Sequence, residues 1–192
     1  MVAAFLSCLP AFLINLLPLA VEDSVPFASR DYFITLALLV FARGMDFLST
    51  WFATPTLALE GNPLAKRLGW KWGIAVNVLL CLAVAHWPLV GLMLVTTSLL
   101  VAARNFKSAW LMRALGETGY SLLVGDAMRH SSRRSFLVSV LGETLLFGLV
   151  GGAVVASSEW PSVPLAVGMG MIAYAVAVAF YSLLSVWRMW RH

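Results

Sequence analysis

The sequence predicts an all-α, polytopic transmembrane bundle of about six helices, forming a single domain over residues 1–192. Of these 192 residues, 61% are hydrophobic and only 11% are charged. A soluble domain carries about 25% charged residues, and none of this size could bury so much apolar surface. The mean hydropathy of +0.89 agrees with a membrane protein. A third observation is that the basic residues lie between the apolar runs, as expected for connecting segments at a membrane surface.

Apolar runs set the predicted spans, because a helix needs about 20 residues to cross the hydrocarbon core. The predicted spans are residues 2–20, 32–54, 72–86, 89–103, 136–157 and 163–187. Pro10 and Pro18 interrupt the first run, which lacks the basic start and the small-residue cleavage site of a signal peptide. A transmembrane helix is therefore favoured there, with a signal-like segment as the alternative. Pro88 can begin a helix but not continue one, so a tight hairpin is expected at residues 86–88.

The distribution of basic residues predicts the orientation. All Lys and Arg residues except Arg30 and Arg43 fall in residues 66–71, 104–134 or 188–191. Six spans place these three segments on one side, which the positive-inside rule assigns to the cytoplasm. Both termini are then cytoplasmic, and the expected location is the plasma (inner) membrane.

Residues 105–134 are expected to form an interfacial amphipathic segment, with Gly116 and Gly119 as breaks. Apolar positions such as Trp110 alternate there with Lys107 and Arg113, so the basic face can lie against anionic lipid head groups. The predicted partners are therefore the lipid bilayer and these head groups, and no nucleic acid is expected. A homo-oligomer or a membrane partner protein is left open.

Polar residues lie at similar depths in several predicted spans. Counting helical rise from the basic side, Asp46, Asn77, Ser98 and Glu143 are about 9–13 Å deep. A charge at such a depth costs several kcal/mol unless it is paired or hydrated. These residues are therefore expected to converge inside the bundle and not to face lipid.

Arg43 is the expected counter-ion of this layer. Arg43, Asp46 and Thr50 share one helical face, and Ser49 flanks it. Arg43 can pair with Asp46 along the helix, and it can also compensate Glu143 if the two carboxylates face one another. The pair either forms part of a functional site or only fixes the register of the helices.

A turn follows at Glu60-Gly61-Asn62-Pro63. One interpretation is a solvated loop. The other is a broken-helix segment that folds back, so that Glu60 and Asn62 cover the mouth of a polar cavity.

Asp46 and Thr50, followed by Glu60-x-Asn62-Pro63, carry a resemblance to a known pattern. This stretch resembles the Asp-x3-Thr and Glu-x-Asn-Pro motif of a family of small, uncharacterised prokaryotic integral membrane proteins. The match covers about residues 43–68, and those proteins are typically shorter than this chain. The resemblance implies that these five residues act as one unit, but it implies no particular activity.

Three functions remain open from the sequence. The leading prediction is a non-enzymatic transporter or channel-like module for a cation, a proton or a small polar solute. The predicted binding residues of the site are Arg43, Asp46, Ser49, Thr50, Glu60, Asn62, Asn77, Ser98, Arg104 and Glu143. The second is a membrane-embedded enzyme acting on a lipid, in which carboxylates serve as acid, base or metal ligands and Arg104 holds a phosphate. The third is an assembly subunit of a membrane complex. No cofactor is predicted, since His86, His130 and His192 are too far apart to ligate one.

Overall fold

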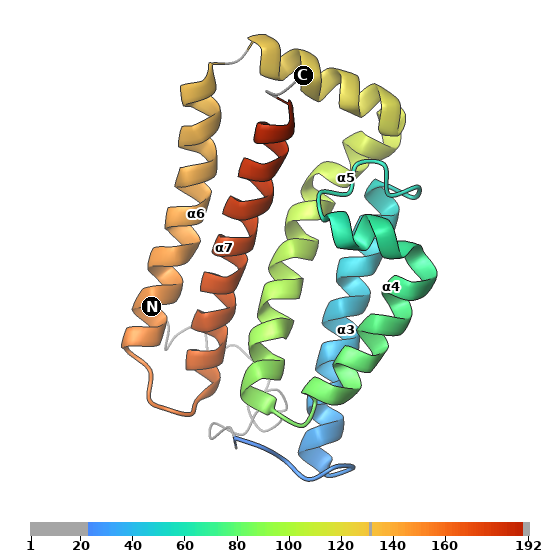
Figure 1. The fold of residues 1–192 in the computed structure, drawn as a ribbon. Helices are drawn as coiled ribbons and strands as arrows, with labels where there is room; N and C mark the ends of the chain where they lie inside the picture. The colour runs from blue at the N-terminus through green and yellow to red at the C-terminus, as the bar shows by residue number, and fades with distance from the viewer. Residues whose placement is uncertain (1–22, 131, 190–192) are drawn as a thin grey trace.

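The computed structural model describes residues 23–130 and 132–189, which form five α-helices (Figure 1). Their bounds are α3, Arg30–Ala53; α4, Pro63–Val84; α5, Pro88–His130; α6, Arg133–Ala156; and α7, Val163–Met189. All five are long and apolar enough to cross a membrane. The predicted span 2–20 lies outside the described residues, so a sixth span and the side on which the termini lie stay predictions.

The described helices form a row in the order α4, α3, α5, α7, α6 (Figure 1). The most extensive contacts join α3 to α5, α6 to α7 and α5 to α7, whereas α4 has only small contacts with α3 and α5. Successive helices alternate in direction, so the end of α3, the start of α4 and the start of α6 meet at one end of the row. We call this the basic end. Its charged residues include Lys66, Arg67 and Lys71 near the start of α4, Lys107, Arg113 and Arg129 in α5, and Arg134 at the start of α6.

Local sequence explains where these helices begin. The Ser29 hydroxyl accepts a hydrogen bond from the Tyr32 backbone N–H at 3.2 Å and caps α3. The Asn62 side chain accepts from the Leu64 N–H at 3.0 Å and caps α4, whose first residue is Pro63. Helix α4 ends at Val84 and α5 begins at Pro88, as the hairpin predicted at residues 86–88 requires.

Two helices are longer than the predicted spans. Helix α4 starts at Pro63 and not at residue 72, and it bends at Gly69, where φ is 64°. Helix α5 does not stop at residue 103 but continues to His130, and it bends at Gly116, where φ is 70°. Glycine adopts this left-handed backbone at little cost. The expected break at Gly119 is absent, and the second half of α5 crosses the basic end towards α6 (Figure 1).

The half of the bundle away from the basic end is closely packed. Leu39, Cys81, Ala85 and Val95 lie in one buried cluster between α3, α4 and α5. On the other side, a Cβ added at Gly168 would lie 2.8 Å from the Gly151 carbonyl oxygen, so α6 and α7 approach through their backbones. Among the described helices, apolar side chains and close backbone contacts thus fill this half of the bundle.

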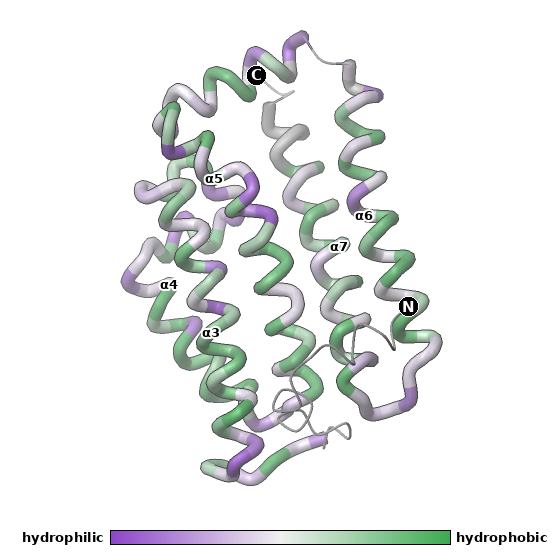
Figure 2. Tube along the Cα trace, turned by 180° about the vertical axis from the view of Figure 1, so that it is seen from behind, coloured by the Kyte–Doolittle hydropathy of each residue, from purple (hydrophilic) through white to green (hydrophobic). Residues whose placement is uncertain are grey.

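Large apolar side chains cover the outside of the helices. Leu79, Val138, Leu149 and Val176 are each more than 60% exposed. Figure 2 shows hydrophobic positions along most of the length of the helices. Water would not favour such a surface, whereas lipid does. The chain is therefore a membrane-embedded helical protein.

Candidate functional site

A cavity of about 790 Å³ lies in the basic half of the bundle. Residues from all five described helices line it, together with the connection between α3 and α4. The charged residues in its lining are Arg43, Asp46, Glu60, Arg104 and Glu143. Asn62, Thr50 and Asn77 also line it, so most of the predicted site residues meet at one cavity.

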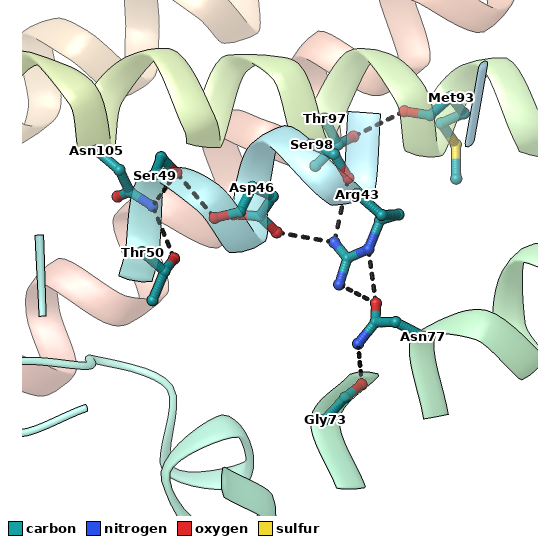
Figure 3. Close-up of polar contacts among 10 residues, drawn as sticks. All are labelled: Arg43, Asp46, Ser49, Thr50, Gly73, Asn77, Met93, Thr97, Ser98 and Asn105. Carbon is teal, nitrogen blue, oxygen red and sulfur yellow. Dashed lines mark hydrogen bonds and ion pairs between the residues drawn. The ribbon is translucent and has the colours of Figure 1, made fainter. Parts of the chain in front are cut away.

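The first charged group in the cavity centres on Arg43 (Figure 3). Its Nη1 atom lies 3.0 Å from Asp46 Oδ2 and 3.1 Å from Ser98 Oγ. Its Nε atom donates to Asn77 Oδ1 at 2.7 Å, and Nη2 donates to the same oxygen. The Asn77 amide in turn donates to the Gly73 carbonyl at 2.8 Å, which fixes the orientation of the side chain. The guanidinium thus joins α3 to α4 and α5.

This group is partly shielded from the cavity. The Arg43 and Asp46 side chains are 25% and 18% exposed, and Ser98 is buried. Arg43 uses most of its five N–H donors within the protein. It therefore has little capacity left for a ligand, whereas Asp46 keeps its Oδ1 atom without a protein partner among the described residues.

Arg104 and Glu143 form a second charged group, between α5 and α6. Arg104 Nη1 lies 3.5 Å from Glu143 Oε1, and the Tyr174 hydroxyl donates to the same oxygen at 2.7 Å. Arg104 Nη2 lies 3.5 Å from Ser182 Oγ. The sequence had suggested Arg43 as a counter-ion of Glu143, but the structure pairs Glu143 with Arg104. Arg43 instead contacts Asn77 of α4 and Ser98 of α5.

The second pair is looser and more open than the first. The Arg104 and Glu143 side chains are 38% and 33% exposed, and both of the Arg104 contacts are long. Contacts of this length are weak hydrogen bonds. Arg104 is therefore the cationic group of the cavity that is most available to a ligand.

Ser49 and Thr50 have different surroundings. Asn105 Nδ2 lies 3.3 Å from both hydroxyl oxygens and joins α5 to α3 (Figure 3). Ser49 is fully buried, and its hydroxyl donates to the Asp46 carbonyl at 2.8 Å. Ser49 therefore contributes to helix packing, whereas Thr50 also lines the cavity. The sequence had not identified Asn105 as their partner.

The connection between α3 and α4 covers part of the cavity. Glu60 Oε1 accepts from the Asn62 backbone N–H at 2.8 Å, which stabilises the turn. Leu57 and Leu59 also line the cavity, and Leu57 is buried at a φ of 60°. The folded-back interpretation of this segment therefore fits the structure better than a solvated loop.

Glu117 holds this connection in place, a role that sequence analysis missed. Its Oε1 atom accepts from the Thr54 hydroxyl at 2.7 Å and from the Thr56 backbone N–H at 3.0 Å. Its Oε2 atom accepts from the Thr56 hydroxyl. We call these contacts the Glu117 clasp. The bend at Gly116 brings the adjacent Glu117 to the connection. The sequence indicates a break at Gly116, but it does not indicate that Thr54 and Thr56 are the partners of Glu117.

The clasp depends on an ionised carboxyl group. Loss of hydration raises the pKa of Glu117, but hydrogen bonds from Thr56 and Thr54 and the nearby Lys66 charge outweigh this effect. The pKa of Glu117 is consequently below its ordinary value. The carboxylate is thus the form that the basic end stabilises.

The described residues contain no group of three or more His, Cys, Asp or Glu side chains arranged to hold a metal ion. The carboxylates of the cavity are instead distributed, with Asp46 beside Arg43 and Glu143 beside Arg104. Acid–base chemistry or ligand binding therefore fits their arrangement better than shared metal ligation.

No family model matches the chain, and no curated protein or solved structure matches it. Four residues of the motif noted above, Asp46, Thr50, Glu60 and Asn62, line the same cavity. Their shared position is consistent with one functional unit.

Proposed function

We propose that the protein is a small transporter-like membrane module that binds a polar ligand in the charged cavity. The observation that carries this proposal is the lining of a cavity of about 790 Å³ by two guanidinium groups and three carboxylates. Ligand pockets typically measure about 300–1,000 Å³. The volume suits a small organic ligand better than a dehydrated ion.

The two ion pairs support binding in different ways. The Arg43–Asp46 pair is extensively hydrogen-bonded and sets the positions of α3, α4 and α5. The Arg104–Glu143 pair is long and partly exposed. An ion pair that only fixed the register of the helices would be more stabilising at close contact. The longer Arg104–Glu143 pair is therefore the better candidate for a pair that opens to bind a ligand.

Transport further requires that the cavity open alternately to each side of the membrane. In the structure, close packing separates it from the end opposite the basic end. Helices α6 and α7 form a hairpin that reaches the other helices through the contact of α7 with α5. Motion of this hairpin against α3–α5 is the change that we propose, by analogy with the rocking of transporter bundles.

The test is the accessibility of a cysteine in the cavity, at Ser139→Cys in a chain with Cys8→Ala and Cys81→Ala. Ser139 lines the cavity on α6. A transporter predicts that an impermeant thiol reagent reaches this cysteine from both sides of the membrane, more slowly from the closed one. Thr118→Cys and Ser157→Cys, exposed at opposite ends, are the controls and should each react from a single side. Reaction of the cavity cysteine from the basic side alone would reject transport.

A lipid-acting enzyme is the second candidate. It is favoured by one observation, namely that α4 and α6 both line the cavity but make no contact with each other among the described residues. This leaves a side of the cavity open to the bilayer, where a lipid could enter. Asp46 or Glu143 would then act as acid or base. Chemical turnover of a lipid by the purified chain, lost in Glu143→Gln at an unchanged melting temperature, would favour the enzyme over the transporter.

A further inference from the structure

Three sides of the cavity are closed by protein. The buried cluster around Leu39 and Val84 lies beyond Arg43, and neither residue lines the cavity. At the basic end, Leu57 and Glu60 of the α3–α4 connection line it, as does Tyr120 from the second half of α5. The Glu117 clasp joins these two covering segments. Helix α5 contacts both α3 and α7, so these three helices form a continuous wall.

The remaining side lies between α4 and α6. These helices are the two ends of the row (Figure 1), yet Gly73 and Asn77 from α4 and Ser139 and Glu143 from α6 line the same cavity. Since α4 and α6 have no mutual contact in the described part of the chain, the row curves round the cavity without closing. Both helices carry exposed apolar side chains, so among the described helices this side has apolar edges and is not closed by protein.

The charges of the lining indicate the chemistry of a ligand on this route. Each arginine has one carboxylate partner, Asp46 for Arg43 and Glu143 for Arg104. The third carboxylate, Glu60, has no cation within 4.0 Å among the described residues, and it repels the charge of Asp46. The cavity therefore offers a loosely held guanidinium at Arg104 and an uncompensated carboxylate at Glu60.

The position of Arg104 suits a lipid head group. Arg104 is sixteen residues from the start of α5, which places it about 24 Å along the helix. The hydrocarbon core is about 30 Å thick. Arg104 therefore lies near the head-group level of the leaflet at the basic end, so a lipid can reach it while its chains stay in the bilayer.

We infer that the cavity binds the head group of a zwitterionic phospholipid, which enters from the bilayer between α4 and α6. Its phosphate contacts Arg104, its ammonium group contacts Glu60, and its acyl chains stay between α4 and α6. This inference rests on the proposed function, in that it names the class of polar ligand. The Arg43–Asp46 pair is the deep wall of the site and does not exchange partners.

A tryptophan placed in the opening tests the route of entry. Ser139→Trp adds bulk to the cavity wall on α6, whereas Val138→Trp adds the same bulk at an exposed position that does not line the cavity. Both full-length variants are purified in detergent, and bound phosphatidylethanolamine is counted by native mass spectrometry. We expect occupancy to fall about tenfold or more in Ser139→Trp and to stay unchanged in Val138→Trp. Equal occupancy in the two variants would reject lateral entry.

Substitution of Glu60 tests the head-group chemistry without altering the helices. Glu60→Gln should weaken binding of phosphatidylethanolamine about tenfold and leave binding of phosphatidylglycerol, which has no ammonium group, unchanged. Glu159→Gln is the matched control, because Glu159 is exposed in the connection between α6 and α7. Equal loss of both lipids in Glu60→Gln, or no loss of either, would contradict the assignment.

Soluble glycerophosphoethanolamine separates failure of this inference from failure of the proposed function. Saturable binding of this compound without retention of the lipid would reject the lipid inference, but it would support the proposed function with a soluble polar ligand. If neither the compound nor the lipid binds, the head-group inference is rejected, and the proposed function then depends on the accessibility of the cysteine at position 139. Retention of a second copy of the chain in place of lipid would also overturn the inference.

Discussion

Arg43 of α3 donates to Asn77 of α4 through Nε at 2.7 Å and again through Nη2. Together with the Tyr32 hydroxyl, which donates to the Leu82 carbonyl at 3.1 Å, this double contact joins α3 to α4. These polar contacts matter because α4 has few packing contacts with α3 and α5. Arg43 and Asp46 are one turn apart on α3, so the helix itself supplies the counter-ion. The same guanidinium therefore sets both the local charge balance and the position of α4.

Replacing only one partner of the Arg43–Asp46 pair should lower the stability of the protein more than replacing both partners. Asp46→Asn leaves a partly buried guanidinium without its counter-ion, which typically costs about 3–5 kcal/mol. The double variant Arg43→Leu with Asp46→Leu removes both charges and should recover part of this loss, less the hydrogen bonds to Asn77 and Ser98. Thermal unfolding of the wild type, Arg43→Leu, Asp46→Leu and the double variant in detergent measures the coupling. If Asp46→Asn unfolds at the wild-type temperature, the pair has no structural role.

The close approach of α6 and α7 predicts a steric effect at Gly168. An alanine there would place its Cβ 2.8 Å from the Gly151 carbonyl oxygen, so the helices must separate. Overpacking of this kind costs about 1–3 kcal/mol. Gly142→Ala is the control on α6, where an added Cβ meets nothing within 4 Å. We expect a lower melting temperature for Gly168→Ala only, and equal melting temperatures would show that α6 and α7 are not held this closely.

The Glu117 clasp should hold the connection between α3 and α4 closed. Glu117→Ala removes the acceptor of three hydrogen bonds, so amide hydrogen exchange in residues 54–62 should become faster. Exchange at the α4–α5 hairpin should not change. Unaltered exchange in residues 54–62 would indicate that packing of Leu57 and Leu59, not the clasp, orders the segment.

The clasp should also depend on pH. The folded-state pKa of Glu117 is lowered, so its stabilising effect is fully present above the ordinary pKa of a glutamate. It is lost as the pH falls through the folded-state value. Exchange in residues 54–62 should therefore accelerate on acidification in the wild type more than in Glu117→Ala, after correction for the intrinsic exchange rate. Parallel profiles for the two chains would contradict this assignment.

Orientation can be tested with single cysteines. The basic end is expected to face the cytoplasm, since Lys and Arg residues accumulate on that side of membrane proteins. Cysteines in residues 117–130 should react with an impermeant reagent only from the cytoplasmic side, and cysteines in residues 157–162 only from outside. Labelling of residues 117–130 in intact cells would invert the proposed orientation.

Composition and helical periodicity were sufficient to predict that the chain forms long apolar helices with polar residues at similar depths, but not the bounds of α4 and α5. Asp46, Asn77 and Glu143 line one cavity because the lengths of the spans already set their depths. The extent of α5 could not be predicted in this way. Arg104 and Asn105 end the apolar run, but a change from apolar to polar residues does not end a helix, and α5 continues past them to the bend at Gly116.

The partners of the charged residues were harder to predict. Helical spacing identifies Asp46 as a partner for Arg43, because both lie on one face of one helix. The choice of Arg104 for Glu143 depends on which faces of α5 and α6 meet, and periodicity does not determine this for helices that are apolar all round. Glu117 reaches Thr54 only because of the bend at Gly116.

The two ion pairs have different consequences for insertion into the membrane. Arg43 and Asp46 belong to the same helix, so α3 can leave the translocon as an electrically neutral segment. Arg104 and Glu143 belong to α5 and α6, and neither is neutralised until both helices are present. Glu143 lies deeper in the membrane than Arg104, and an unpaired charge in hydrocarbon is costly, so α6 should enter the bilayer against α5 and not alone. The second pair would thereby make the bilayer entry of these two helices cooperative.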